Sequence, residues 1–220
     1  KGDGTRIAII DSGVDDSHPD LDVNVAESKN FTGDGLGAGV PGGGDHGTHV
    51  AGIAAANTAG ATGVAGIAPE AELLDFRVFS NFGGTNGAFS IVVAAVVEAA
   101  RKDCDVANLS LGAYPIPREG LGSFYGGLLN ATMSYANRQG TLVVAAAGND
   151  AADLQSDEGY LIDVDGDGEL ERLDGGGWIS LPNEAAGVMS VAATGPIGFA
   201  NELTGGSVSE PAETPAGYTN

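Results

Sequence analysis

Two short segments of the chain place a carboxylate and an imidazole where they could act together on a proton. Asp11 follows the aliphatic run Ile7–Ile10, which predicts a buried strand that ends in an acid. His46 lies in the run Asp45–Gly52, where a loop turns into a helix of small residues. An acid that orients a histidine, which then acts as a base, is the arrangement that activates a hydroxyl nucleophile. The two segments therefore predict an acid–base pair.

Both residues also have plainer interpretations. Asp11 could cap the turn before Gly13, because a buried carboxylate needs hydrogen bonds to offset its lost hydration. His46 and His49 are three residues apart on one helix, a spacing that can serve a metal ion, yet no third Cys or His ligand lies nearby in the sequence. His46 could also be a buried structural histidine.

These segments resemble two sequence boxes of the subtilisin-like serine proteases. The runs Asp11–Asp15 and His18–Leu21 are similar to the family's Asp box, and His46–Gly52 is similar to its His box. The resemblance implies that Asp11 orients the base, that His46 is the general base, and that the second histidine of the box is a structural core residue. We expect His46 Nδ1 within hydrogen-bond reach of Asp11, at roughly 2.6–3.2 Å.

Two further segments extend the resemblance. Ala145–Asn149 resembles the oxyanion segment, which implies that the Asn149 amide donates to the tetrahedral intermediate; a turn-forming Asn is the alternative. Asn108–Gly112 resembles the segment that lines the first specificity pocket, and the Gly83–Gly87 region would supply the opposite edge for an extended peptide. The implied substrate-binding residues are Ser110, Leu111, Gly112 and Gly84.

The family's third catalytic box, a Gly-Thr-Ser-Met-Ala type sequence with the nucleophilic Ser, does not occur in the 220 residues. We expect this Ser beyond residue 220, in a larger secreted precursor, and we expect the 220 residues alone to be inactive. The resemblance then implies a serine endopeptidase that acts on polypeptide substrates and is made with a propeptide. The alternative is a catalytically inactive module that binds peptides.

An acidic insertion at about 151–178 contains a pattern typical of calcium loops. Its carboxylates follow D-x-D-x-D-G with a further acid at position 12, and Gly166 allows the sharp turn. An acidic hairpin turn without a metal is the alternative. The resemblance adds Asp20, which matches a calcium-ligating Asp of many subtilisins. The predicted structural Ca²⁺ ligands are Asp163, Asp165, Asp167, the Glu169 carbonyl, Asp174 and, at a second site, Asp20.

The arrangement of apolar runs predicts the elements that must position these residues. Continuous rather than alternating hydrophobicity indicates strands buried on both faces, hence a largely parallel sheet with helices between strands. We therefore expect an α/β fold, a three-layer, mainly parallel doubly wound sheet that is incomplete at its C-terminal side, in one partial peptidase domain over residues 1–220. The predicted strands are Ile7–Ile10, Leu73–Val78, Val106–Leu111, Leu142–Ala147 and Val188–Ala193, and the predicted helices are Gly47–Ala56, Ala88–Lys102 and Leu121–Arg138.

Charge and composition restrict the partners. Thirty acidic and nine basic side chains give a net charge of −21, which disfavours nucleic acid and anionic membranes as partners. No run of 18 apolar residues predicts a membrane span. The acidity fits either an ordinary acidic exoprotein or adaptation to high salt, and we expect a monomer. Cys104, the single cysteine, cannot form an intrachain disulfide and is expected at a helix-to-strand junction.

Overall fold

A computed structural model describes residues 1–42, 44–57, 63–80, 89–149, 160–162, 171–173 and 177–193 of the chain. The chain divides into two compact units. The first comprises residues 1–110, 127–144 and 185–189, and the second comprises residues 111–126, 145–184 and 190–220. The two units are described separately below, and one domain over residues 1–220 stays a prediction.

A six-stranded sheet is the central element, with the strand order β10-β6-β4-β1-β3-β2. The non-consecutive neighbours require crossover connections, which is typical of α/β domains with helices between the strands. The strands of this sheet are β1 (Arg6–Asp11), β2 (Lys29–Asn30), β3 (Glu72–Arg77), β4 (Val106–Leu109), β6 (Leu142–Ala146) and β10 (Val188–Val191).

Strand β1 lies between β3 and β4 and runs parallel to both. In its register with β3, Ile9 is opposite Asp75 and Asp11 is opposite Arg77. Residues opposite each other in parallel strands point to the same face, and so do residues two positions apart. The side chains of Asp11, Asp75 and Arg77 therefore share one face of the sheet.

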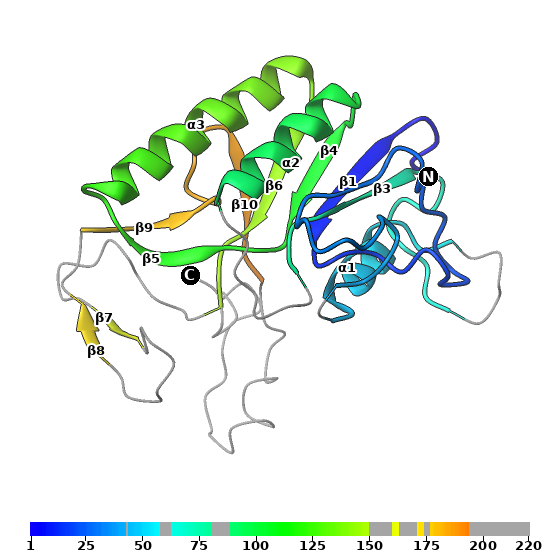
Figure 1. Cartoon of the computed structure of the whole chain (residues 1–220), viewed down its shortest axis with the longest axis horizontal. Helices are drawn as coiled ribbons and strands as arrows, with labels where there is room; N and C mark the ends of the chain where they lie inside the picture. Colours follow the sequence, from blue (N-terminus) through cyan, green and yellow to red (C-terminus); the bar gives the residue numbers. More distant parts are fainter. Residues whose placement is uncertain are drawn as a thin grey trace. The chain divides into compact units, whose positions relative to one another are not determined.

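Helices α1 (His46–Ala55) and α2 (Phe89–Arg101) both contact β1 and lie on opposite faces of this part of the sheet (Figure 1). On the α1 face, Ile7 and Ile9 pack in one core cluster with Ala51 and Ala55 of the helix. Small helical side chains let α1 lie close to the strands. Helix α3 (Leu121–Gln139) precedes β6. None of the helices in the described part of the chain combines the length and apolarity that a membrane crossing requires.

The second unit contains two antiparallel strand pairs. Strands β5 (Ala113–Pro117) and β9 (Trp178–Leu181) form one pair, with an irregular register between Ala113 and Ile116. Strands β7 (Tyr160–Ile162) and β8 (Glu171–Leu173) form the other, with Tyr160 opposite Leu173.

The structure confirms the predicted fold class. Each of the five predicted strands and three predicted helices corresponds to an element of the same type, with ends displaced by at most two residues. Cys104 is buried between α2 and β4, as expected, and burial raises the pKa of its thiol to about 12. The expectations did not include β2, β5 or β9.

Candidate active site

His46 and Asp11 lie together at the carboxyl end of β1. His46 Nδ1 is 2.8 Å from Asp11 Oδ1, which confirms the expected hydrogen-bond distance. An ionised carboxylate only accepts hydrogen bonds, so beside an ionised Asp11 this contact requires the proton of a neutral imidazole on Nδ1 and leaves the Nε2 lone pair free. The Asp11 side chain is fully buried, whereas the His46 side chain is 59% exposed. The imidazole is thus anchored on one side and open to a reactant on the other.

The carboxylate of Asp11 is held mainly through one oxygen. Oδ1 accepts a hydrogen bond from the Ser12 amide at 2.7 Å in addition to its contact with His46. Oδ2 is buried and accepts no hydrogen bond from any residue that the structure describes. A buried carboxylate with an unsatisfied oxygen is costly, so surrounding charges matter strongly for this site.

Glycines at two positions allow α1 to start directly against the end of β1. A Cβ on Gly47 would lie 2.5 Å from the Gly13 carbonyl oxygen and 3.2 Å from Asp11 Cβ. Gly13 itself has φ +102°, which L side chains rarely adopt. The Gly47 amide donates to Ser12 Oγ at 3.0 Å, which satisfies one of the free amides in the first turn of the helix. These contacts fix the point from which His46 projects.

A glycine-rich segment, residues 33–42, packs against the same strand end. The Gly42 amide donates to the Ser12 carbonyl at 2.6 Å, and a Cβ on Gly13 would lie 2.5 Å from the Val40 carbonyl oxygen. Gly39 and Gly42 are buried although other parts of this segment are exposed. Its two buried glycines make this loop part of the wall around Asp11.

Sequence reasoning missed three charged residues beside this wall: Asp34, Asp75 and Arg77. The Arg77 side chain is fully buried, forms an ion pair with Asp34, and donates through Nε to the Phe79 carbonyl at 3.0 Å. Its guanidinium lies so close to Gly42 that a Cβ there would be 2.0 Å from Nε. A signal was present in the sequence, because Asp75 and Arg77 interrupt an apolar strand at alternate positions.

The Asp34 carboxylate is strongly stabilised in its ionised form. Desolvation by burial opposes this, but hydrogen bonds from the Asn30 side chain, the Leu36 amide and Thr32, together with the Arg77 charge, lower the pKa of Asp34 to about 2. Asp34 therefore remains a fixed negative partner for Arg77 over the physiological pH range.

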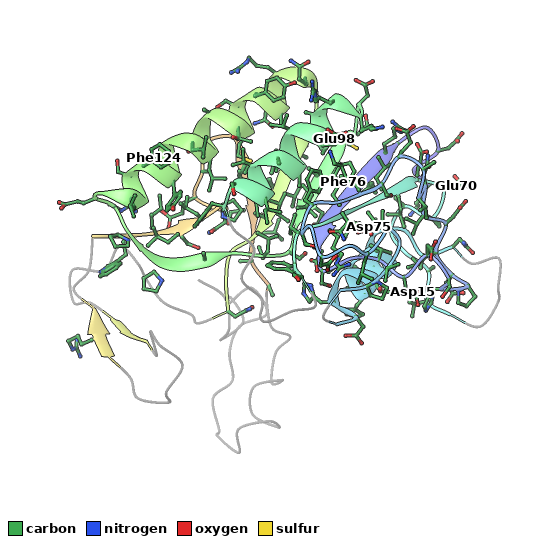
Figure 2. The ribbon with its side chains drawn as sticks, in the orientation of Figure 1. Asp15, Glu70, Asp75, Phe76, Glu98 and Phe124 are labelled. Carbon is green, nitrogen blue, oxygen red and sulfur yellow. The ribbon has the colours of Figure 1, made fainter. Side chains whose placement is uncertain are left out.

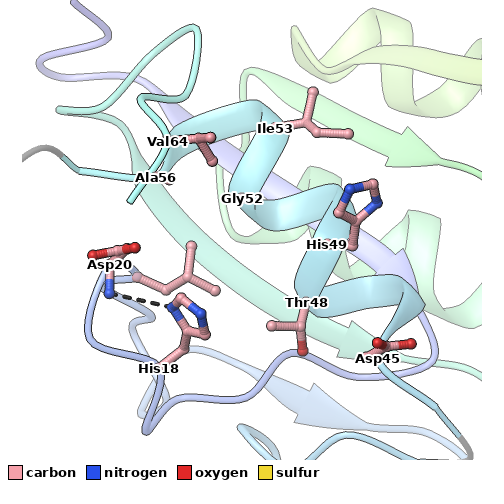
Figure 3. Close-up of a pocket in the computed structure, with 10 residues that line it drawn as sticks. His18, Asp20, Asp45, Thr48, His49, Gly52, Ile53, Ala56 and Val64 are labelled. Atoms are coloured by element: carbon pink, nitrogen blue, oxygen red, sulfur yellow. Dashed lines mark hydrogen bonds between the residues drawn. The ribbon is translucent and has the colours of Figure 1, made fainter. Parts of the chain in front are cut away.

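The expectation that His49 is a core residue is wrong. Its side chain is exposed and borders a pocket of about 320 Å³ on the outer side of α1 (Figure 3). Residues three apart on a helix lie on the same face, so an exposed His46 at the helix start places His49 toward solvent as well. His18, Asp20, Ile53 and Val64 also line this pocket.

The expected substrate-binding and oxyanion residues follow two strand ends. Ser110 comes directly after β4, and its Oγ accepts a hydrogen bond from the Asn108 side chain at 3.0 Å. Leu111 and Gly112 follow it in the second unit, as does Asn149, which is exposed beyond the end of β6. Gly84 lies outside the described residues. The roles of these residues stay predictions.

The predicted calcium ligands are only partly visible. Asp163, Asp165, Asp167, Glu169 and Asp174 lie outside the described residues, whereas the flanking strands β7 and β8 are present and paired. For the second site, the Asp20 carbonyl accepts the Asn57 amide at 2.8 Å, and Gly63 lies directly against the Asp20 carboxylate. Within the described ranges, no group of three His, Cys, Asp or Glu side chains could hold a metal ion.

Comparison with known proteins places the chain in a family. The model of the subtilase family matches residues 2–218. Thermitase from Thermoactinomyces vulgaris is 34% identical over 149 residues, which cover 68% of this chain and 49% of thermitase. The major intracellular serine protease of Bacillus subtilis (strain 168) is 34% identical over 208 residues, covering 93% of this chain and 54% of that protein.

A solved structure agrees with the sequence relatives. Sphericase superposes with a TM-score of 0.65 and 28% identity, covering 99% of this chain and 59% of sphericase. The chain spans about half the length of the sequence relatives it matches. The match of the family model over nearly all of its length, together with the strand order and the Asp11–His46 contact, shows that this chain belongs to the subtilase family.

Proposed function

We propose that the protein containing this chain is a serine endopeptidase that hydrolyses peptide bonds with an Asp–His–Ser triad. The observation that carries the proposal is the contact of 2.8 Å between His46 Nδ1 and the buried Asp11 carboxylate, in a chain of the subtilase family. Asp11 holds the imidazole in the tautomer whose Nε2 can accept a proton. The nucleophilic Ser would come from beyond residue 220.

The proposed reaction uses the pair in two steps. His46 Nε2 removes the proton of the Ser hydroxyl as the oxygen attacks the peptide carbonyl, and His46 then donates that proton to the leaving amine. Asp11 stabilises the imidazolium that exists between these steps. Asn149 would donate to the oxyanion, and Ser110, Leu111 and Gly112 would pair with an extended polypeptide substrate.

The three histidines of the chain give a direct test in the full-length protein. His46→Ala should reduce kcat/KM for a peptide substrate by on the order of 10⁴-fold or more, because the general base is lost. His18→Ala and His49→Ala are matched controls and should change kcat/KM by no more than a few fold. Equal losses in all three variants would contradict the assignment of the base.

A second readout separates the enzyme from the peptide-binding alternative. A fluorophosphonate probe, which reacts with activated serines, should label the full-length parent and should not label His46→Ala. If the parent neither hydrolyses peptides nor reacts with the probe but binds extended peptides, the inactive binding module is the better description.

The location of the protein in the cell stays a prediction. We expect it to be secreted, but one relative is named as an intracellular protease.

We also propose that the acidic insertion binds a structural Ca²⁺ through Asp163, Asp165, Asp167, Asp174 and the Glu169 carbonyl. The pairing of β7 with β8 supports this, because the acidic run then separates two strands of one hairpin in the sequence. Ca²⁺ at a hundredfold excess over Kd should stabilise the full-length protein by about 2.7 kcal/mol. Thermal melts with Ca²⁺ or a chelator check this, and Asp165→Ala should abolish the difference. An equal rise in both proteins would place the ion elsewhere, for example at Asp20.

A further inference from the structure

Asp75 is a buried acid that the proposed reaction does not use. It lies in β3 with no exposed surface, on the face of the sheet that also carries Asp11. Asp75 and the aromatic Phe76 project to opposite sides of the strand (Figure 2). One oxygen, Oδ2, accepts a hydrogen bond from the Gly39 amide at 2.9 Å. The other, Oδ1, is buried and accepts none from the described residues.

The hydrogen bond of Asp75 connects it to the backbone around Asp11. Gly39 belongs to the glycine-rich segment, whose Gly42 amide donates to the Ser12 carbonyl at 2.6 Å. Ser12 in turn donates its amide to Asp11 Oδ1 and accepts the Gly47 amide at its Oγ. A continuous set of hydrogen bonds and backbone contacts thus links β3, the glycine-rich segment, the end of β1 and the start of α1.

Charged groups of the described residues act on Asp75 from several elements, and the Asp16 carboxylate lies beside the Gly39 that binds it. Arg77 from the same strand favours the ionised carboxylate, but it is ion-paired with Asp34. Asp11 from β1 disfavours it, and the amides of Gly39 and Val14 favour it. Burial is the largest effect and raises the pKa of Asp75 to about 6. Asp75 therefore changes its charge in the pH range in which an ordinary histidine also titrates.

We propose that Asp75 is a positioning residue for the Asp11–His46 pair. Through the Gly39 amide it holds the glycine-rich segment against Ser12 and Gly13, and through its charge it sets the field in which His46 takes a proton. An ionised Asp75 adds a second negative charge on the sheet face that carries Asp11, and this added charge favours the imidazolium. This inference rests on the proposed function, since it assigns Asp75 a part in the work of the same pair.

Two substitutions separate the charge of Asp75 from its hydrogen bond. Asp75→Asn keeps an acceptor for the Gly39 amide and removes the charge, whereas Asp75→Ala removes both. In the full-length protein, Asp75→Asn should move the acid limb of kcat/KM to lower pH by roughly half a unit or more. Asp75→Ala should show the same shift and a lower melting temperature. Asp22→Asn removes an equal charge from an exposed position and serves as the matched control.

An NMR titration of the His46 ring protons gives a readout that does not depend on hydrolysis. The midpoint should move to lower pH in Asp75→Asn and stay in place in Asp22→Asn. This keeps the test distinct from that of the proposed function, because an inactive parent would still show the shift. An unchanged midpoint in Asp75→Asn would overturn the proposal.

The parent protein provides the decisive measurement if the Asp75 variants do not fold. Two interacting groups that titrate in the same range give two macroscopic steps. The His46 ring signal of the parent should therefore show a second inflection near the pKa of Asp75. A single inflection, with no carboxyl group titrating near pH 6 by ¹³C NMR, would contradict the coupling.

Discussion

The two ends of the β1–β3 strand pair use charge in opposite ways. At the amino end, Arg6 is opposite Glu72 and the two form an ion pair at 2.5 Å, with side chains 27% and 38% exposed. At the carboxyl end, Asp11 is opposite Arg77, but each binds another partner. Oppositely charged residues are thus paired in the strand register at both ends. At the amino end they form a surface ion pair, and at the carboxyl end they belong to a buried polar site.

The charged residues at the two ends of these strands therefore differ in burial and in their expected roles. The amino-end pair remains hydrated, so it can be lost with little consequence. The carboxyl end buries Asp11, Asp75 and Arg77 completely, and each leaves one polar atom without a hydrogen bond from the described residues. Such a site costs stability, and under the proposed function it is where Asp11 orients the imidazole.

The largest expected effect breaks the carboxyl end. Asp11→Asn in the full-length protein should lower kcat by about 10⁴-fold, because a neutral amide no longer fixes the tautomer or stabilises the imidazolium. Arg6→Gln, at the other end of the same strand, should leave kcat unchanged. Steady-state kinetics on a peptide substrate check both. A comparable loss in the two variants would mean that the strand as a whole, rather than its carboxyl end, supports activity.

The second effect concerns stability and pH. A carboxyl whose pKa rises from 3.8 to about 6 on folding contributes stability that is fully present below pH 3.8 and is lost as the pH rises through 6. Asp75→Asn removes this dependence. We therefore compare the free energy of unfolding of Asp75→Asn with that of the parent at each pH. The difference, variant minus parent, should be larger at pH 8 than at pH 4 by up to about 3 kcal/mol. Urea unfolding at the two pH values measures it, and a difference independent of pH would contradict the buried ionisation.

Much of this carboxyl end could be predicted from the sequence. The aliphatic run before Asp11 and the small residues after His46 indicate a buried strand and a closely packed helix, and both occur. The charged residues Asp75 and Arg77 were missed because the run 73–78 was interpreted through its apolar members. Two charges at alternate positions of a buried strand indicate a shared polar face, and that pattern could have revealed them.

Two of the strands that the expectations omitted, β2 and β5, depend on tertiary pairing. Strand β2 has only two residues, and its pairing depends on the position of β3. Strand β5 contains Pro115 and Pro117, which disfavour a strand from sequence, and it forms by pairing with β9. Tertiary contacts rather than local pattern determine such elements.

The third effect sharpens the comparison at the start of α1. Gly47→Ala should destabilise the protein by about 1–3 kcal/mol and lower activity, because the new Cβ would overlap the Gly13 carbonyl oxygen and displace the strand end. Gly52→Ala in the same helix is the matched control. It has open space around the new Cβ and should stabilise the protein by up to about 1 kcal/mol. Thermal unfolding and kinetics of both variants decide whether close packing at Gly47 is required.

The smallest effect is expected at the amino end. The hydrogen bond with Arg6 is the first cause that lowers the pKa of Glu72, so this pair contributes stability above the ordinary pKa of Glu72 that is lost as the pH falls through the lowered value. Because both side chains are partly exposed, Arg6→Gln should cost only about 0.2–1 kcal/mol near pH 7. The cost should shrink in 1 M salt and at acidic pH. Urea unfolding of Arg6→Gln, Glu72→Gln and the double variant measures the coupling between the two side chains. A coupling that persists in high salt would show that the amino end is as shielded from solvent as the carboxyl end, and the contrast between the two ends would fail.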